Sequence, residues 1–168
     1  MPTAIYGNKY LVPALFEAGK GDLALEFLFG TGHISFGTML NDGATSIWEK
    51  LELHSVESPE KRVNSYNHPM HGGFLYACYT HLAGIHPLSA GFKEFVFKPC
   101  FVKGVNKVST ALDTVCGKIS VDIEGSRCRL TVPTGTRCQV DIEGEVTVNG
   151  TPYEKGSLLG SGQYEITW

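Results

Sequence analysis

The chain lacks several features that would assign it to a special class of protein. It has no run of basic residues, because its 14 lysines and arginines are interspersed with 17 acidic residues, for a formal net charge of -3 at pH 7. A nucleic-acid partner or an anionic membrane surface would require a basic patch, so neither partner is expected. No uninterrupted apolar run approaches the roughly 18 residues that suggest a membrane span.

Signals for export, disulfides and metal binding are also missing. The N-terminus has no charged segment followed by an apolar one, so no secretory signal is indicated and the compartment stays open, with the cytoplasm as the default. The five cysteines are widely spaced, without a Cys-x-x-Cys pair, which argues against a disulfide framework and a thiolate zinc site. Most of them are expected to be small buried residues. No cofactor is indicated.

What is present is the composition of an ordinary globular protein. The 168 residues are 42% hydrophobic and 18% charged, enough to bury one good core or two small ones. The sequence predicts an α+β fold, with an N-terminal helical segment over residues 1–90 and an antiparallel β-sandwich over residues 91–168.

Helical periodicity dominates the first part of the chain. It predicts paired antiparallel helices over Lys9–Ala18 and Leu23–Phe29, with Asp22 as the N-cap of the second. A third helix is predicted over Ala44–Leu53 and a fourth over Met70–Gly84, the latter with Phe74, Leu75, Cys78 and Leu82 on its packing side. The charged segment Glu57–Asn64 between them is expected to be an exposed loop.

Strand signals dominate from Gly91 onward. Alternating apolar residues punctuated by glycine turns predict strands at Phe92–Phe97, Val105–Cys116, Lys118–Ile123, Arg129–Val132, Gln139–Ile142, Val146–Val148 and Tyr164–Trp168. Asn149-Gly150 between two short apolar runs predicts a two-residue hairpin turn. Tyr164 and Trp168 are expected to complete the sandwich core.

The stretch from Asn41 to Met70 contains the side chains most typical of a sugar site. It places a carboxylate (Glu49), a large aromatic ring (Trp48) and an imidazole (His68) in one loop-linked unit. Carbohydrates need flat apolar surfaces for their C–H faces and fixed partners for their hydroxyls, and a hydrolase adds a carboxylate that takes a proton from water. Glycoside hydrolysis normally uses two carboxylates, and this stretch supplies one half of such a pair.

The string Gly43-Ala44-Thr45-Ser46-Ile47-Trp48-Glu49 resembles the motif in the last helices of the (α/α)6 barrel of family 78 glycoside hydrolases, the bacterial α-L-rhamnosidases. Further landmarks follow in the order found in that family: Tyr10–Leu15, Gly21–Ala24, Ser35–Gly37, Ser65–His68, Leu82–Ile85, Ala90–Phe92 leading to Lys98-Pro99, and Val132-Pro133. The resemblance covers essentially the whole chain. Phe36 and Leu51 depart from it, because the family commonly has tryptophan at both positions.

The resemblance implies an inverting hydrolase of terminal α-L-rhamnosides, in which an acid protonates the departing oxygen and a second carboxylate activates water. Glu49 stands at the position of that general base, and the candidate substrate-binding residues are His68, Trp48, Asn67 and Asp42. The general acid of the family lies far upstream, in a barrel half that this sequence does not contain. The chain looks like the C-terminal fifth of such an enzyme and is expected to be inactive alone.

Each candidate also has a structural alternative. Glu49 could be a helix-surface carboxylate paired with Lys50, and Trp48 could anchor the core rather than stack on sugar. Asp42 could cap the helix that follows it, and His68 could bond backbone at the start of the next helix.

His68 and His71 together form His-x-x-His. No carboxylate or third imidazole is placed to complete a zinc set, so no metal site is expected.

Three functional hypotheses follow. The first is part of an α-L-rhamnosidase that acts on an L-rhamnose-containing glycoside when joined to the missing barrel half. The second is a non-catalytic carbohydrate-binding or structural β-sandwich module. The third is a homo-oligomer whose helices substitute for the absent barrel, since orphaned apolar helix faces favour self-association.

Overall fold

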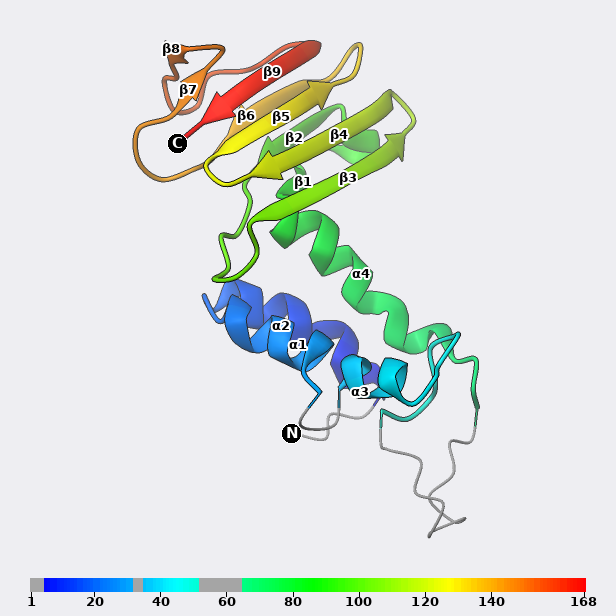
Figure 1. Ribbon diagram of the computed structural model, residues 1–168. Helices are drawn as coiled ribbons and strands as arrows, with labels where there is room; N and C mark the ends of the chain where they lie inside the picture. The colour runs from blue at the N-terminus through cyan, green and yellow to red at the C-terminus, as the bar shows by residue number, and fades with distance from the viewer. Residues whose placement is uncertain (1–4, 32–34, 52–64) are drawn as a thin grey trace, which may run out of the picture. The chain divides into compact units, whose positions relative to one another are not determined.

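The computed structural model describes residues 5–31, 35–51 and 65–168 (Figure 1). The chain forms two compact units, residues 1–77 and 78–168. The α+β class predicted from the sequence is confirmed, with helices in the first unit and two β-sheets in the second. A domain division at residue 90 stays a prediction. Among the described residues no helix combines the length and apolarity needed to cross a lipid bilayer.

Helices α1 (Ile5–Glu17) and α2 (Gly21–Phe29) form the predicted helical pair of the first unit. The pair closes over Val12 and Phe16 from one helix and Leu28 from the other, all nearly inaccessible to solvent. Asp22 was expected to cap α2, but it lies inside the first turn and the N-cap is Lys20, without a side-chain hydrogen bond. The helix begins earlier than predicted, so the Asp22 carboxylate lies near its positive end.

A short helix that the sequence analysis missed, α3 (Phe36–Asn41), follows α2. A reciprocal capping box begins it, in which the Thr38 N–H donates to Ser35 Oγ and the Ser35 N–H donates to Thr38 Oγ1, both at 3.0 Å. A Cβ atom on Gly37 would stand 2.5 Å from the Phe29 carbonyl oxygen. Glycine therefore allows α3 to start directly against the end of α2.

The helix predicted over Ala44–Leu53 is wrong for the described residues, because 44–51 are not helical. Gly43 has a φ of +85°, and the Glu49 N–H donates to a carbonyl beyond its own segment, that of Ser65. Backbone hydrogen bonds to a segment distant in the sequence thus take the place of the local bonds that a helix would form. The predicted loop Glu57–Asn64 lies outside the described residues.

The fourth predicted helix is confirmed as a continuous helical stretch made of three geometries: a 3₁₀ turn η2 (Pro69–Gly73), α4 (Phe74–Ala77) and a π turn η3 (Cys78–Leu82). Its packing side differs from the prediction. Leu75 is 52% exposed, whereas Ala77 and the polar Thr80 and His81 are buried. The mixed geometry shifts the angular spacing between residues, so the 3.6-residue period does not locate the buried face.

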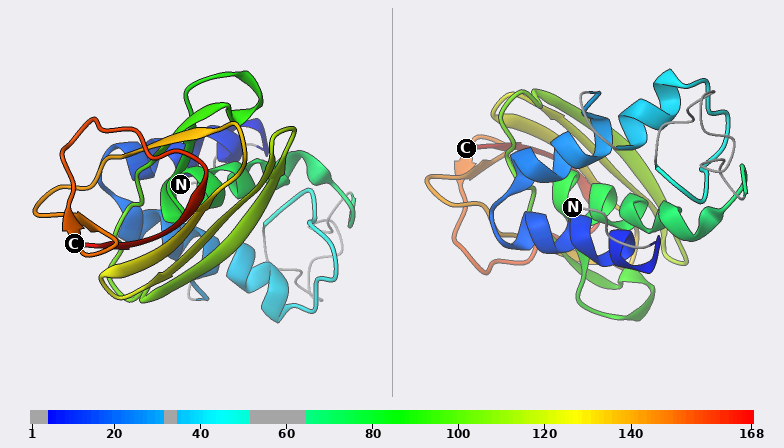
Figure 2. Two further views of the ribbon diagram at one scale, coloured as in Figure 1. Left: turned by 90° about the horizontal axis from the view of Figure 1, so that it is seen from above. Right: turned by 90° about the horizontal axis from the view of Figure 1, so that it is seen from below.

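The second unit contains two sheets, which appear together in the views of Figure 2. The smaller one has the order β1-β2-β6, built from β1 (Ile85–Pro87), β2 (Glu94–Phe97) and β6 (Arg137–Val140). The larger has the order β3-β4-β5-β9-β7-β8, built from β3 (Lys107–Thr114), β4 (Gly117–Glu124), β5 (Arg127–Val132), β9 (Gly162–Thr167), β7 (Thr147–Val148) and β8 (Thr151–Pro152). All described pairs are antiparallel except β2 with β6, which is parallel.

Apolar side chains from both sheets form one core. Phe95 and Phe97 of β2 and Leu130 of β5 are completely buried, and Tyr164 and Trp168 pack against the cluster as expected. A short 3₁₀ turn, η4 (Ala90–Phe92), leads into β2. The alternation of buried and exposed residues along the strands explains why the sandwich could be predicted.

The Asn149-Gly150 hairpin is confirmed. Both residues have positive φ, +51° and +78°, and Val148 pairs with Thr151 across the turn. The Asn149 Oδ1 atom accepts the Glu165 N–H at 2.8 Å, which ties the turn to β9.

All five cysteines are free thiols. Only Cys128 and Cys138 are buried, fewer than expected, and burial raises the pKa of each to about 12. They behave as apolar core residues.

Asp141 accepts two ammonium groups, from Lys98 at 2.5 Å and Lys155 at 2.8 Å, and these hydrogen bonds hold the pKa of its carboxyl below its ordinary value. A depressed folded-state pKa contributes stability above the unfolded pKa, near 4, and that contribution is lost as pH falls through the folded pKa. We expect Asp141→Asn to lower the melting temperature by a few degrees at pH 7. The difference in melting temperature between the variant and the wild type should disappear at acidic pH. Asp113→Asn, which breaks a more exposed pair with Lys118, is the matched control, and an equal loss there would contradict this reasoning.

Candidate functional site

The polar loop that follows α3 runs antiparallel to the segment leading into η2. The His68 N–H donates to the Ile47 carbonyl at 2.7 Å, and the Glu49 N–H donates to the Ser65 carbonyl at 2.9 Å. These two backbone bonds hold the predicted general base and the predicted sugar-binding imidazole on paired segments of the first unit. The proximity could not be read from the sequence, because it depends on pairing across the intervening residues.

Side-chain bonds fix the backbone around Asn67. Ser65 Oγ accepts the Asn67 N–H at 3.2 Å and donates to the Asn67 carbonyl at 3.1 Å. Ser46 Oγ donates to the Tyr66 carbonyl on the same turn. Asn67 is exposed, so its backbone is held while its amide faces solvent.

Glu49 is partly buried in this loop and is not on a helix. Its one described hydrogen bond is the backbone bond to Ser65, and it forms no ion pair with Lys50 or any other described residue. The structural alternative of a paired helix-surface carboxylate therefore does not describe it.

Trp48 is 7% exposed. Its backbone N–H donates to the Met39 sulfur at 3.4 Å, and its ring meets the Tyr66 ring edge-on at 5.3 Å. Burial favours the core-anchor alternative, and Tyr66, which is 46% exposed, presents the aromatic surface that solvent reaches. A stacking role for Trp48 stays a prediction.

Asp42 does not cap the helix predicted after it, because residues 44–51 are not helical. It is the C-cap of α3 instead, and its N–H donates to the Thr38 carbonyl at 3.0 Å. Its side chain is exposed. Sugar contact by Asp42 stays a prediction.

His71 was considered in the sequence analysis only as one half of His-x-x-His, and the structure shows that its ring is buried. It is 3% exposed, and neither ring nitrogen has a hydrogen-bond partner within the described chain. Burial lowers its pKa, the neighbouring His68 lowers it further, and Glu49 partly raises it. The two backbone bonds between the loop and the segment before η2 bring the chain segments of Glu49, His68 and His71 together. The burial of the His71 ring could not be inferred from helical periodicity, because the turn that carries it is a 3₁₀ turn.

No three potential ligands gather into a metal site within residues 5–31, 35–51 and 65–168.

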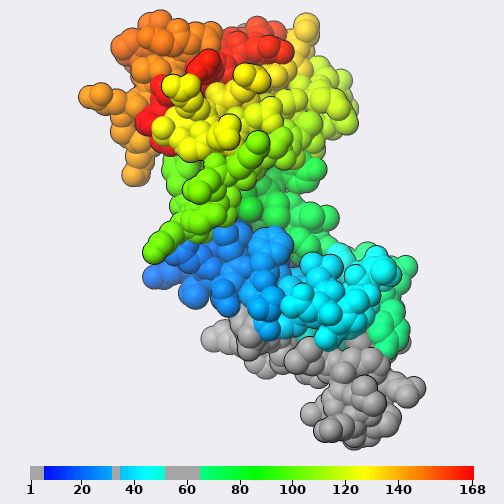
Figure 3. Space-filling view, in the orientation of Figure 1, coloured from blue at the N-terminus to red at the C-terminus, as the bar shows by residue number. Residues whose placement is uncertain are grey.

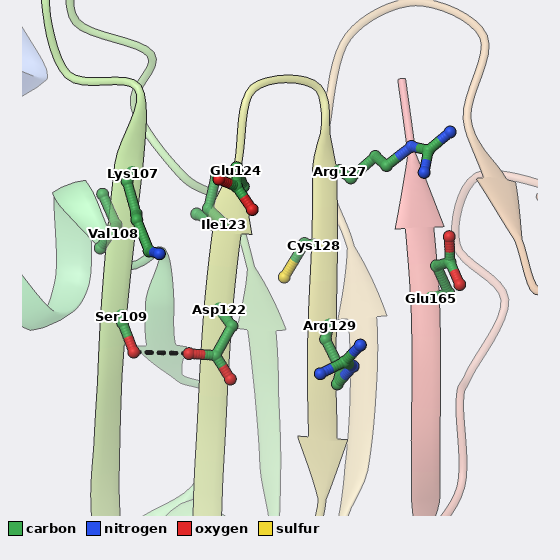
Figure 4. A pocket seen from close by; sticks show the side chains of 10 residues that line it. All are labelled: Lys107, Val108, Ser109, Asp122, Ile123, Glu124, Arg127, Cys128, Arg129 and Glu165. Atoms are coloured by element: carbon green, nitrogen blue, oxygen red, sulfur yellow. Dashed lines mark hydrogen bonds between the residues drawn. The ribbon is translucent and has the colours of Figure 1, made fainter.

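A concavity lies on the outer face of the large sheet in the second unit, away from the predicted site residues (Figure 4). This groove of about 590 Å³ is lined by Lys107, Val108, Ser109, Asp122, Ile123, Glu124, Arg127, Cys128, Arg129 and Glu165. Ser109 Oγ donates to the Asp122 carboxylate, and basic and acidic side chains alternate across the strands. It has no aromatic lining residue and contains none of the predicted site residues, so it resembles a solvated sheet face.

Two protein-family models match this chain, and together they cover most of it. Residues 1–82 match the family model of the bacterial alpha-L-rhamnosidase 6 hairpin glycosidase domain, and residues 84–157 match that of the bacterial alpha-L-rhamnosidase C-terminal domain. Both models describe domains of one glycosidase family. The chain belongs to the bacterial α-L-rhamnosidase family, and the resemblance noted in the sequence is confirmed.

Curated relatives agree along nearly the full chain. An alpha-L-rhamnosidase of Formosa agariphila is 30% identical over 191 residues, covering 99% of this chain and 20% of the relative. One from an Alteromonas species is 27% identical over 176 residues, covering 98% and 19%. The chain thus spans about a fifth of the length of these relatives.

Solved structures agree in fold. The alpha-L-rhamnosidase from Dictyoglumus thermophilum matches with a TM-score of 0.83 at 24% identity, over 99% of this chain and 21% of that one. The Streptomyces avermitilis enzyme, solved in complex with L-rhamnose, matches with a TM-score of 0.82 at 24% identity, over 96% and 17%.

Proposed function

We propose that this chain carries the general-base part of an inverting hydrolase of terminal α-L-rhamnosides. The observation that supports this most directly is the paired loop that holds Glu49 beside the segment of His68. A partly buried carboxylate without an ion-pair partner among the described residues is free to accept a proton from water, and an adjacent imidazole offers a partner to a sugar hydroxyl.

The proposed chemistry is a single displacement at the sugar that involves two proton transfers. Glu49 takes a proton from a water molecule as that water attacks the anomeric carbon from the face opposite the leaving group. A second carboxyl, about 6.5–9.5 Å away in inverting enzymes, gives a proton to the departing oxygen. We assign no described residue to that second role, so the chain alone is expected to bind sugar weakly and not to hydrolyse it.

A two-dimensional NMR titration with L-rhamnose tests the proposal. We expect saturable shifts at residues of the paired loop, weakened by His68→Ala and largely retained in Glu49→Gln, because the amide has the size of the carboxylate. Glucose serves as a sugar of the wrong shape and should give smaller shifts. If rhamnose and glucose give the same unsaturated response at tens of millimolar, no rhamnose site is formed in this chain.

The alternative is a non-catalytic module that self-associates through its helices. The apolar side chains left exposed in the first unit favour it: Tyr6, Tyr10, Leu23, Phe29 and Leu40 are each more than half exposed. Helices α2 and α3 form part of the visible surface in Figure 3, in blue and cyan. Absent rhamnose shifts together with a dimer in sedimentation analysis would support this alternative over the first proposal.

A further inference from the structure

His71 stands out because its burial has no polar compensation. The side chain is 3% exposed, and Nδ1 and Nε2 both lack a hydrogen-bond partner among the described residues, as does Nδ1 of His68 on the same turn. Buried polar atoms are nearly always paired, and leaving one unpaired costs stability. Three such atoms within one 3₁₀ turn require an explanation.

The apolar surroundings of His71 do not explain why a residue with ring nitrogens stands there. Its ring meets the Phe36 ring edge-on at 5.8 Å, and Phe36 in turn packs on Phe74 at 4.7 Å. A phenyl ring in place of the imidazole would fill this space without an unpaired nitrogen. The imidazole is therefore not needed for packing.

The charged and titratable groups around His71 are few. His68 is the N-cap residue directly before the turn, and Glu49 lies on the paired loop. Lys9 of α1 lies against Gly73, and its ammonium is over the Tyr10 ring at 5.6 Å. Glu49 is the only acidic residue on the two paired segments, residues 44–51 and 65–73.

Resting on the proposed function, we propose that His71 is a positioning residue for Glu49. Its neutral imidazole N–H donates a hydrogen bond to the Glu49 carboxylate when sugar occupies the site, and this bond orients the carboxylate toward the attacking water. Hydrogen bonds of this kind are often open in the unliganded protein and close on binding.

A neutral donor suits this task better than a cation. A lysine or arginine beside Glu49 would stabilise the carboxylate strongly and weaken it as a base. An imidazole kept uncharged by burial can fix the direction of the carboxylate and leave its negative charge uncancelled. The pKa of His71 is lowered mainly by burial, which keeps the ring in this neutral form near pH 7.

Three variants of the whole chain test the proposal by NMR titration of the histidine rings and of the Glu49 carboxyl, each with and without L-rhamnose. Glu49→Gln should lower the pKa of His71 by about half a unit or more, because it removes a nearby negative charge. His71→Phe should raise the pKa of Glu49, and His71→Gln, which keeps a neutral donor, should restore it. The effects of both His71 substitutions should grow when rhamnose is bound.

His86 is the internal control. Burial lowers its pKa too, but its neighbours are His81, Lys98 and Asp141 of the second unit. Its titration should be the same in all variants. His71→Phe is expected to fold, since the phenyl ring fits beside Phe36.

The outcomes separate this proposal from the proposed function. Rhamnose binding with a Glu49 pKa that is equal in His71→Phe and wild type would overturn the positioning role and leave the sugar site standing. Coupled titration of His71 and Glu49 without rhamnose binding would support the pairing and count against the sugar site in this chain. If neither rhamnose binding nor coupled titration is observed, the positioning role and the sugar site in this chain are both overturned.

Discussion

Gly84→Ala is expected to destabilise the second unit by about 2–5 kcal/mol, the sum of left-handed strain and steric overlap. Gly84 has a φ of +74°, and a Cβ atom there would stand 2.3 Å from the Pro99 nitrogen, a backbone atom that cannot move alone. Its carbonyl also accepts the Lys98 N–H at 2.8 Å, which fixes the close approach. Urea unfolding followed by circular dichroism measures the loss.

Gly104→Ala is the matched control for this prediction. Gly104 has a φ of +87°, but nothing lies within 4 Å of the position that a Cβ atom would take there. Only the strain of the left-handed backbone applies, about 1–2 kcal/mol. The difference between the two variants isolates the steric part. Equal unfolding midpoints would show that the approach to Pro99 relaxes freely.

Phe97→Ala is expected to cost about 3–5 kcal/mol, because it empties a large volume at the centre of the sandwich. Phe97 is completely buried on β2, and its carbonyl accepts the Asp141 N–H at 2.9 Å, so the strand cannot easily move inward to fill the space. The same urea experiment applies. Phe97→Leu, which keeps most of the volume, should cost about 1.5 kcal/mol or less and remain folded.

Phe101→Ala tests whether the stability lost in Phe97→Ala comes from the burial of the ring or from the loss of an aromatic side chain as such. Phe101 is 56% exposed and stacks on Trp168 with ring centres 4.9 Å apart. Removing that contact should cost about 1 kcal/mol. A loss as large as that of Phe97→Ala would contradict the assignment of the core to the space between the sheets.

The sandwich could be predicted because its signals are local. Along β3 and β4 exposed residues alternate with more buried ones, and Asn149-Gly150 fits a turn that requires two positive φ angles. The parallel pairing of β2 with β6 could not be predicted, since no short window contains both strands. The sequence indicated most of the strands, but it missed β1 and did not indicate that β2 and β6 are neighbours.

The loop that carries Glu49 is where local reasoning failed. The residues after Gly43 have acceptable helix propensity, but Ile47 and Glu49 make their backbone bonds with His68 and Ser65. Tertiary pairing therefore overrides propensity, a balance that cannot be judged from one segment. The sequence named His71 only as a possible metal ligand for a related reason, because its lack of hydrogen-bond partners among the described residues exists only once its neighbours have enclosed it.

The parallel pairing of β2 and β6 also bears on the order in which the second unit folds. β3, β4 and β5 form a meander between consecutive strands, whereas β6 must cross that whole meander to reach β2. Closing so long a loop costs chain entropy before any contact is gained, so long-range pairings form late. Pairing of β6 with β2, which encloses Phe95 and Phe97, is thus expected to be the last step in forming the sandwich.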